Sequence, residues 1–137
     1  MTRRTVAVAA LLFGGVCAGQ PSKPPSDVAK VYTGKVVPAK GGGLALVAGD
    51  GTATPIVEDA GSAMLFQDRR LQNRPVRLTA LLVPATKSLR VVKVQTVKDG
   101  KAYDVDYWCE ICQISGSTPG KCVCCGDDTE FRERPAP

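Results

Sequence analysis

The sequence predicts a small, mostly β domain with a single helix, followed by a cysteine-rich tail. Short runs of β-branched and apolar residues recur between turns, and the chain has fourteen Gly and ten Pro to form those turns. Five of the six cysteines fall between residues 109 and 125. A length of 137 residues with 44% hydrophobic residues suits one small domain with appendages.

The N-terminal residues are typical of an export signal. Arg3-Arg4 forms a positively charged start, residues 6–16 form an apolar run, and small residues precede a cleavage point after Ala18. We expect a signal peptide over residues 1–18, because this apolar run is too short for a permanent transmembrane helix. The alternatives are a lipoprotein anchored through acylated Cys17 and a leader that stays uncleaved. All three outcomes imply export to the periplasm or the cell exterior, in the second case as a membrane-anchored lipoprotein.

A Pro- and Ser-rich linker over residues 19–30 leads into three predicted strands. Gly34 interrupts the first strand, which indicates a bulge or a sharp coil. Asp50-Gly51 after the second strand is a strong hairpin signal, and Pro55 is tolerated in the third only near an edge or a strand start. The three strands are predicted over residues 31–37, 44–47 and 54–58.

The pattern then changes to helical spacing and afterwards returns to strand. Apolar residues recur at helical spacing within residues 59–67, with Asp59 or Ser62 as the N-cap. Two further strands are predicted over residues 76–83 and 89–97. In the second of these, the alternation of apolar residues slips between Val91 and Val92, which indicates a β-bulge.

Three strands, one helix and two strands, in this order, are the elements of the OB-fold, a five-stranded Greek-key barrel with its helix between strands three and four. We therefore predict an OB-like barrel over residues 31–98, with another small β-barrel or a sandwich as the alternative. Through the Gly34-interrupted first strand and the fourth and fifth strands, residues 31–97 resemble small exported bacterial OB-fold-like domains of unknown function with a C-terminal CxxC…CxCC tail.

The composition argues against several classes of function. The chain has no histidine, which removes Ser-His and Cys-His catalysis, and we predict no enzyme and no catalytic residues. OB barrels that bind nucleic acid stack bases on aromatic side chains, but residues 31–97 offer only Tyr32 and Phe66, the latter expected in the core. We expect no nucleic-acid partner. Residues 31–97 carry nine basic and four acidic side chains, and this balance favours an anionic ligand or attraction to the acidic tail.

One more strand, over residues 101–108, is predicted to extend the sheet and to project the tail from one end of the barrel. Tyr107 and Trp108 at its end are expected to pack against the barrel rim. An acidic solvent face is predicted, with a second cation site as the alternative, for Asp104, Asp106, Asp127 and Asp128.

The tail, residues 99–137, has too few apolar side chains to form a core and therefore needs a covalent or metal staple. Two cysteine pairs that face each other across a turn can surround one tetrahedral zinc ion. Gly126 after the second pair is typical of a metal knuckle, whereas Gln113 occupies the matching position after the first. We predict a structural four-cysteine metal site, most simply for zinc, with Cys124 as an alternative ligand. Its four ligands are Cys109, Cys112, Cys122 and Cys125.

Two other uses of the cysteines remain open. Structural disulfides suit an oxidising compartment, although five cysteines after residue 18 are an odd number. A thiol redox or metal-transfer protein would use Cys109/Cys112 and Cys124. Trp108 and the CxxC after it match the local pattern of thioredoxin-like enzymes, but the 25 residues beyond Cys112 cannot build a βαβ unit. We predict a non-catalytic binding or structural module of the cell envelope, which contacts an unknown envelope component or an anionic ligand.

Overall fold

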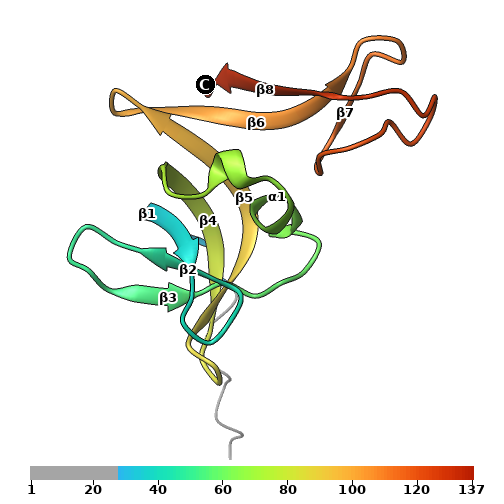
Figure 1. The fold of residues 1–137 in the computed structure, drawn as a ribbon. Helices are drawn as coiled ribbons and strands as arrows, with labels where there is room; N and C mark the ends of the chain where they lie inside the picture. Colours follow the sequence, from blue (N-terminus) through green and yellow to red (C-terminus); the bar gives the residue numbers. More distant parts are fainter. Residues whose placement is uncertain (1–27) are drawn as a thin grey trace, which may run out of the picture.

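Residues 28–137 form a mostly antiparallel, open β-sheet with one short α-helix. A computed structural model describes residues 28–137, so the predicted signal peptide, Cys17 and most of the predicted linker lie outside the described residues. The strands follow the order β3-β2-β1-β4-β5-β6-β7, and β8 also pairs with β6 (Figure 1). The elements are β1 (Lys30–Pro38), β2 (Leu44–Val47), β3 (Ala53–Pro55), α1 (Ala63–Gln67), the 3-10 helix η1 (Arg69–Leu71), β4 (Pro75–Val83), β5 (Ser88–Lys98), β6 (Lys101–Cys109), β7 (Ile114–Gly116) and β8 (Glu130–Pro135).

The predicted order of six strands and one helix is confirmed as far as β6, whereas β7 and β8 were not predicted. β1 lies between β2 and β4 and is antiparallel to both. The segment just after β3 meets the beginning of β5 through one parallel bridge, between Ile56 and Leu89. The Val57 N–H donates to the Leu89 carbonyl oxygen at 2.9 Å beside this bridge.

Gly34 marks the point at which β1 changes partner. Residues Lys30–Lys35 pair with β4, and residues Lys35–Pro38 pair with β2. A Cβ atom at Gly34 would lie 2.3 Å from the carbonyl oxygen of Val47, so only glycine allows the two backbones to approach this closely. The pairing of β1 with β4 runs through Gly34 without a register shift, so no bulge is present there, and it is this close approach that requires glycine.

The bulge predicted in β5 is confirmed at Val92. Thr79 pairs with Lys93 and Ala80 pairs with Val91, so Val92 is the extra residue between them. The Val92 side chain is 60% exposed, whereas Val91 and Val94 are buried. The bulge therefore keeps the apolar residues on both sides of it directed toward the core.

The helix is shorter than the predicted range because its first residues form a turn. The Asp59 carboxylate accepts hydrogen bonds from the N–H groups of Gly61 (3.0 Å) and Ser62 (3.3 Å). Ser62 holds the N-cap position, but its hydroxyl donates to the Val57 carbonyl oxygen instead of capping the helix. Within residues 28–137, no helix has the length and apolar character needed to cross a membrane.

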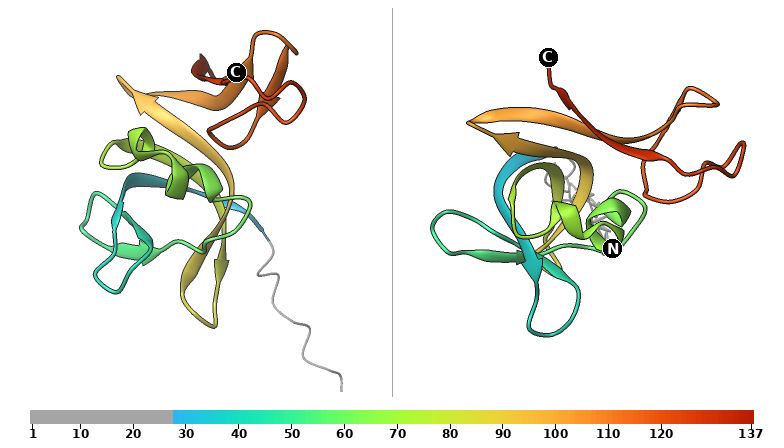
Figure 2. Two further views of the ribbon diagram at one scale, coloured as in Figure 1. Left: turned by 45° about the vertical axis from the view of Figure 1, so that its right-hand side comes forward. Right: turned by 45° about the horizontal axis from the view of Figure 1, so that its top comes forward.

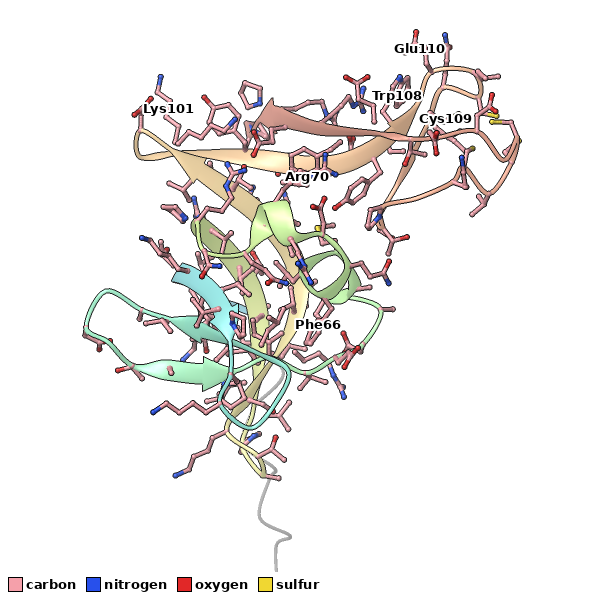
Figure 3. All side chains as sticks on the ribbon, in the orientation of Figure 1. Phe66, Arg70, Lys101, Trp108, Cys109 and Glu110 are labelled. Carbon is pink, nitrogen blue, oxygen red and sulfur yellow. The ribbon has the colours of Figure 1, made fainter. Side chains whose placement is uncertain are left out.

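Aliphatic side chains from β1, β2, β4, β5 and both helices form the core. Leu65 of α1 and Leu71 of η1 are fully buried, so the helical segment covers one end of this core. Tyr32 and Phe66 pack against it, as expected for Phe66 (Figure 3). The core residues are Val36, Leu44, Leu46, Ile56, Leu65, Leu71, Val76, Leu78, Ala80, Leu89, Val91 and Val94.

β6 carries the chain away from this body. Only Lys101–Asp104 pair with β5, and the strand then pairs with β8 along most of its length and with β7 at its end. We call residues 28–100 the body and residues 101–137 the arm. In Figures 1 and 2 the end of the arm that carries β7 extends beyond the body. The predicted strand over residues 101–108 and the projecting tail are both present.

The arm contacts the body at a joint around Asp68, the residue between α1 and η1. The Tyr107 hydroxyl donates to Asp68 Oδ2 at 2.7 Å, and Arg70 forms an ion pair with the same carboxylate at 2.8 Å. The Arg70 guanidinium also lies 4.3 Å from the ring centroid of Phe131, which packs against the body core. Figure 3 shows Arg70 between the helical segment and the arm. Tyr107 is buried here, as expected for packing against the body.

Trp108 does not pack against the body, and that part of the prediction is wrong. Because side chains alternate along a strand, Trp108 lies on the opposite face of β6 from Tyr107. Its ring lies under the Arg132 guanidinium at 4.1 Å, and its Nε1–H donates to Glu110 at 2.9 Å. Trp108 therefore belongs to the outer face of the arm.

Candidate metal centre

The far end of the arm brings together the four cysteines predicted as ligands. Cys109 is the last residue of β6, Cys112 lies in the turn before β7, and Cys122 and Cys125 lie in the loop between β7 and β8. The four Sγ atoms all lie within 4.8 Å of one another. Cys109 and Cys122 are buried, Cys112 is half-buried and Cys125 is exposed. Figure 3 shows Cys109 at this end of the arm.

The first pair forms a turn with the features of a metal knuckle. The Cys112 N–H donates to Cys109 Sγ at 3.4 Å, and the Gln113 N–H donates to the Cys109 carbonyl oxygen at 2.8 Å. Gln113 has φ 54°, in the left-handed region that favours glycine. Gln113 therefore accepts the backbone conformation that glycine normally supplies after the second cysteine of a knuckle.

The second pair forms a matching turn. The Cys124 N–H donates to Cys122 Sγ at 3.4 Å, and the Gly126 N–H donates to the Cys122 carbonyl oxygen at 2.9 Å. Gly126 has φ 76°, so it corresponds to Gln113 in the first turn. Two equivalent turns thus direct their sulfur atoms toward a common point, which is the arrangement expected of a four-thiolate site.

The distances suit a metal ion better than a disulfide. Cys109 Sγ and Cys125 Sγ are 3.5 Å apart, and none of the five cysteines between residues 109 and 125 is in a disulfide. Sulfur atoms around a tetrahedral zinc ion, with Zn–S bonds of about 2.3 Å, lie about 3.8 Å apart. A disulfide requires about 2.05 Å. The four-cysteine group can therefore hold a metal ion with little rearrangement.

The surroundings of the cysteines shift their pKa values in opposite directions. The backbone N–H groups of Cys125 and Cys124 lower the pKa of the Cys122 thiol to about 7, because they stabilise its thiolate. Hydrogen bonds with the sulfur atoms of Cys124 and Cys125 raise the pKa of Cys112, because they stabilise its protonated form. Metal binding would displace the remaining thiol protons from the cluster, because cysteine binds a metal as the thiolate.

Backbone pairing closes the long loop that carries the second pair. The Cys122 N–H donates to the Asp127 carbonyl oxygen at 2.7 Å, and the Thr129 N–H donates to the Gly120 carbonyl oxygen at 3.1 Å. Lys121 forms an antiparallel bridge and an ion pair with Asp128 at 2.6 Å. These contacts form a small loop that presents Cys122 and Cys125 from one side.

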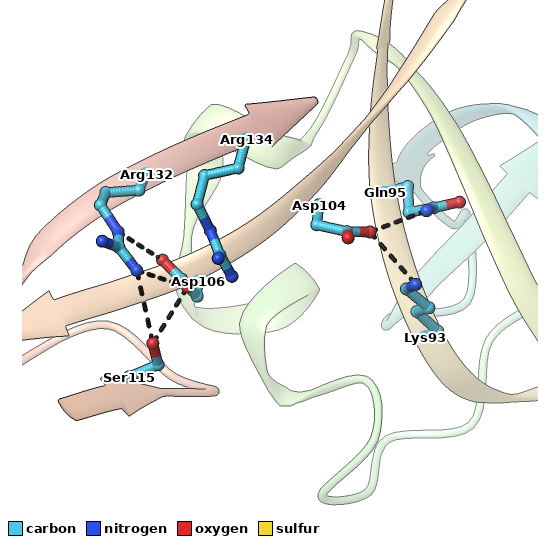
Figure 4. A network of polar contacts seen from close by, with 7 residues as sticks. All are labelled: Lys93, Gln95, Asp104, Asp106, Ser115, Arg132 and Arg134. Atoms are coloured by element: carbon cyan, nitrogen blue, oxygen red, sulfur yellow. Dashed lines mark hydrogen bonds and ion pairs between the residues drawn. The ribbon is translucent and has the colours of Figure 1, made fainter. Parts of the chain in front are cut away.

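Asp106 corrects the prediction of an acidic solvent face. Its carboxylate is buried and accepts hydrogen bonds from Arg132, Arg134 and Ser115 at 2.8–3.0 Å (Figure 4). The hydrogen bond from Arg132 lowers the pKa of Asp106. Asp106 therefore joins β6, β7 and β8 at the base of the cysteine-bearing end, and neither a solvent face nor a second cation site describes it.

Asp104 also forms polar contacts, although its side chain is less buried than that of Asp106. It accepts a hydrogen bond from Gln95 Nε2 at 2.8 Å and pairs with Lys93 at 3.2 Å, so it links β6 to the body (Figure 4). The hydrogen bond from Gln95 lowers its pKa. Asp127 and Asp128 are exposed, as predicted.

The sequence contains a signal for this network that the predictions above do not include. Asp104 and Asp106 are two residues apart on β6, and Arg132 and Arg134 are two residues apart on β8. In the antiparallel pairing Asp104 faces Arg134 and Asp106 faces Arg132. Matched D-x-D and R-x-R segments flanking the cysteines could therefore have indicated β8.

The thioredoxin-like pattern around the first pair is not accompanied by the corresponding structure. In those enzymes the CxxC opens a helix, whose N-terminus lowers the thiol pKa. Here Cys109 ends a strand, and the residues after it form a turn that leads into β7. The match is confined to the sequence around Trp108.

Comparisons with models of known protein families, with curated proteins and with solved structures find no match to this chain. The resemblance to small exported OB-fold-like domains therefore stays a prediction, and function has to be inferred from the site itself.

Proposed function

We propose that this protein is an exported, non-catalytic binding or structural module whose arm is folded around a structural zinc site with four cysteine ligands. The observation that carries this proposal is the convergence of four sulfur atoms, from two equivalent turns, within 4.8 Å of one another. Four thiolates fill a tetrahedral coordination shell and leave no open position for a substrate. The absence of histidine from the whole chain also favours an all-sulfur, structural site over a catalytic one.

The packing of the arm explains why a metal is needed. Ile111 and Val123, the aliphatic side chains of the two turns, are 66% and 99% exposed, and Ile114 is also exposed. The residues buried at this end are cysteines, Cys109 and Cys122. A structural zinc ion contributes on the order of 10 kcal/mol of apparent binding energy, which is enough to order a segment without an apolar core.

We further propose that the body is an OB-like barrel that holds the arm and binds a partner molecule. The order β3-β2-β1-β4-β5, with a parallel bridge between Ile56 and Leu89, supports this architecture. The basic balance of the body favours an anionic envelope component as the partner. Export, with or without a lipid anchor at Cys17, follows from the N-terminal sequence alone.

Native mass spectrometry of the full chain, produced with its leader in an exporting host, tests the proposal. The expected result is one zinc ion per chain, together with a mass that shows cleavage near Ala18 or acylation at Cys17. A chain that retains no metal and has lost hydrogen atoms in pairs would show disulfides and contradict the site.

A thiol redox or metal-transfer protein is the second candidate, favoured by the exposed Cys124 outside the four-sulfur group. Such a protein would exchange disulfide or metal with a partner during its normal function. The structural site predicts slow exchange instead. Incubation of the zinc-loaded chain with isotopically distinct zinc would separate the two, because a transfer protein should exchange its zinc rapidly, whereas a structural site should retain it.

A further inference from the structure

A polar hollow of about 370 Å³ lies where the outer face of the body meets the C-terminal end of the arm. Arg77 alternates with buried residues on β4, so its side chain is on the face of the sheet opposite the core. Gln95 of β5 pairs with Arg77 and lies beside it on this face. The Ala136 N–H donates to the Ala102 carbonyl oxygen at 3.0 Å, so the segment after β8 forms the other wall. The volume is at the lower end of the range of about 300–1,000 Å³ that small-molecule sites occupy.

The two charged side chains that line this hollow are both cationic. Arg77 comes from β4, and Lys101 begins β6 at the turn after β5, where Figure 3 shows it. The eight ion pairs within residues 28–137 use neither of them. Asp104, which contacts Gln95, already pairs with Lys93. The side chains that line the hollow therefore leave an excess of two positive charges, which favours an anionic ligand.

Two uncharged polar groups of the hollow are also available to a ligand. Gln95 is only 8% exposed, and its side chain forms one hydrogen bond within residues 28–137, from Nε2 to Asp104 at 2.8 Å. Figure 4 shows the amide oxygen of Gln95 directed away from Asp104, which leaves a nearly buried acceptor without a donor. Tyr103 adds a half-buried phenol to the same hollow. An acceptor and a phenol beside two cations suit a ligand that carries hydroxyl groups as well as negative charge.

We propose, on the basis of the anionic partner proposed above for the body, that this hollow binds a sugar unit that carries a phosphate monoester. Such a phosphate has a charge of about −1.5 to −2 at neutral pH, which matches the two cations. The Arg77 guanidinium donates to two phosphate oxygens, and the Lys101 ammonium donates to the third. Gln95 Oε1 accepts a hydrogen bond from a sugar hydroxyl. The small apolar side chains of Ala102 and Pro135 contact the C–H groups of the sugar ring.

The test is an NMR titration of the isotope-labelled full chain, supplied with zinc, with glucose 6-phosphate as the probe. The probe should shift the amide signals of Arg77, Gln95 and residues 101–103. It should bind about tenfold more tightly than inorganic phosphate or glucuronate, because only the probe engages both cations and the hydroxyl acceptor. Glucose alone, which lacks the charge, should leave these signals unshifted.

Substitutions locate the binding energy. Arg77→Gln changes an exposed side chain and should weaken the binding of glucose 6-phosphate about tenfold. Arg69→Gln removes another exposed arginine, outside the hollow and with the same change in net charge, and should bind as the wild type does. A phosphorylated trisaccharide that binds as tightly as the probe would support the site and assign it to the end of a glycan, whereas its exclusion would support the site and assign it to a free sugar phosphate.

Equal affinities for glucose 6-phosphate and inorganic phosphate would overturn the proposal, because the sugar would then contribute nothing. Equal weakening by Arg77→Gln and Arg69→Gln would also overturn it, because binding would then reflect net charge alone. Shifts confined to residues outside the hollow would overturn this site and leave an anionic partner for the body in place. The metal site can fail separately, because elemental analysis of the same sample reports its zinc content.

Discussion

The body of this protein buries twelve aliphatic side chains in a continuous core, whereas the far end of its arm leaves its aliphatic side chains exposed and buries sulfur. Between these extremes, the base of the arm is held by the buried carboxylate of Asp106 and its two arginines. The main stabilising interaction thus changes along the molecule. It is apolar packing in the body, ion pairing at the base of the arm and a four-cysteine cluster at its far end. The difference shows that a segment too short to enclose a core can still be ordered when polar and sulfur groups replace one.

The largest effect should come from removing a ligand in the arm. Cys122→Ser takes away a buried sulfur that accepts a backbone hydrogen bond, and the arm should lose most of the roughly 10 kcal/mol that a structural zinc supplies. Zinc stoichiometry by elemental analysis should fall from one to near zero, while the body keeps its β-sheet circular dichroism. Cys124→Ser is the matched control and should keep one zinc. Tight zinc binding by Cys122→Ser would assign the site to other ligands.

A core substitution should act on the body instead. Leu78→Ala removes a fully buried side chain from β4 and should cost about 2–5 kcal/mol of unfolding free energy, because it leaves a cavity. Denaturant unfolding followed by circular dichroism measures this loss. Leu82→Ala, on the same strand but 44% exposed, should cost much less. Similar losses at the two positions would mean that the body lacks the tight core described above.

The ion-pair network at the base of the arm should contribute less than the core. Asp106→Asn leaves two arginines without their shared carboxylate and should cost about 1.5–3 kcal/mol, the usual range for hydrogen bonds to charged groups. Asp128→Asn removes an exposed carboxylate and should change the unfolding free energy by less than about 0.5 kcal/mol. Equal losses of unfolding free energy at the two positions would show that the burial of Asp106 adds nothing to stability.

The same network gives the arm a pH dependence of known sign. The pKa of Asp106 is lowered in the folded state by its hydrogen bond from Arg132. Its stabilising contribution is therefore present above the unfolded pKa of about 3.9 and is lost as the pH falls through the lower, folded pKa. Asp106→Asn should accordingly show a shallower loss of stability below about pH 4 than the wild type.

The smallest effect is expected at the joint between the two regions. Tyr107→Phe removes the hydroxyl that donates to Asp68, but Arg70 still pairs with that carboxylate, so the cost should be about 1 kcal/mol. Thermal unfolding compared with Tyr103→Phe, a tyrosine on the same strand, measures the difference. No difference between the two variants would mean that the Tyr107 hydroxyl contributes nothing to the attachment of the arm to the body.

The parts that could be predicted from sequence are those with a local physical signal. Three features have such a signal, because each reflects a constraint within a few residues. They are the break in apolar alternation at Val92, the glycine at position 34 within β1, and the two cysteine pairs. The parts that could not be predicted depend on distant partners. β8 carries alternating charges and little apolar character, so it is recognisable as a strand only through its pairing with β6. Asp106 resembles a surface carboxylate until Arg132 is placed opposite it.

Amide hydrogen exchange of the full chain, with and without a zinc chelator, tests most directly the claim that sulfur and metal order the end of the arm while an apolar core orders the body. We predict that removal of zinc accelerates exchange strongly within residues 109–129 and leaves the amides of β1, β4 and β5 protected. Exchange that stays slow in residues 109–129, or that accelerates equally in both regions, would contradict this account.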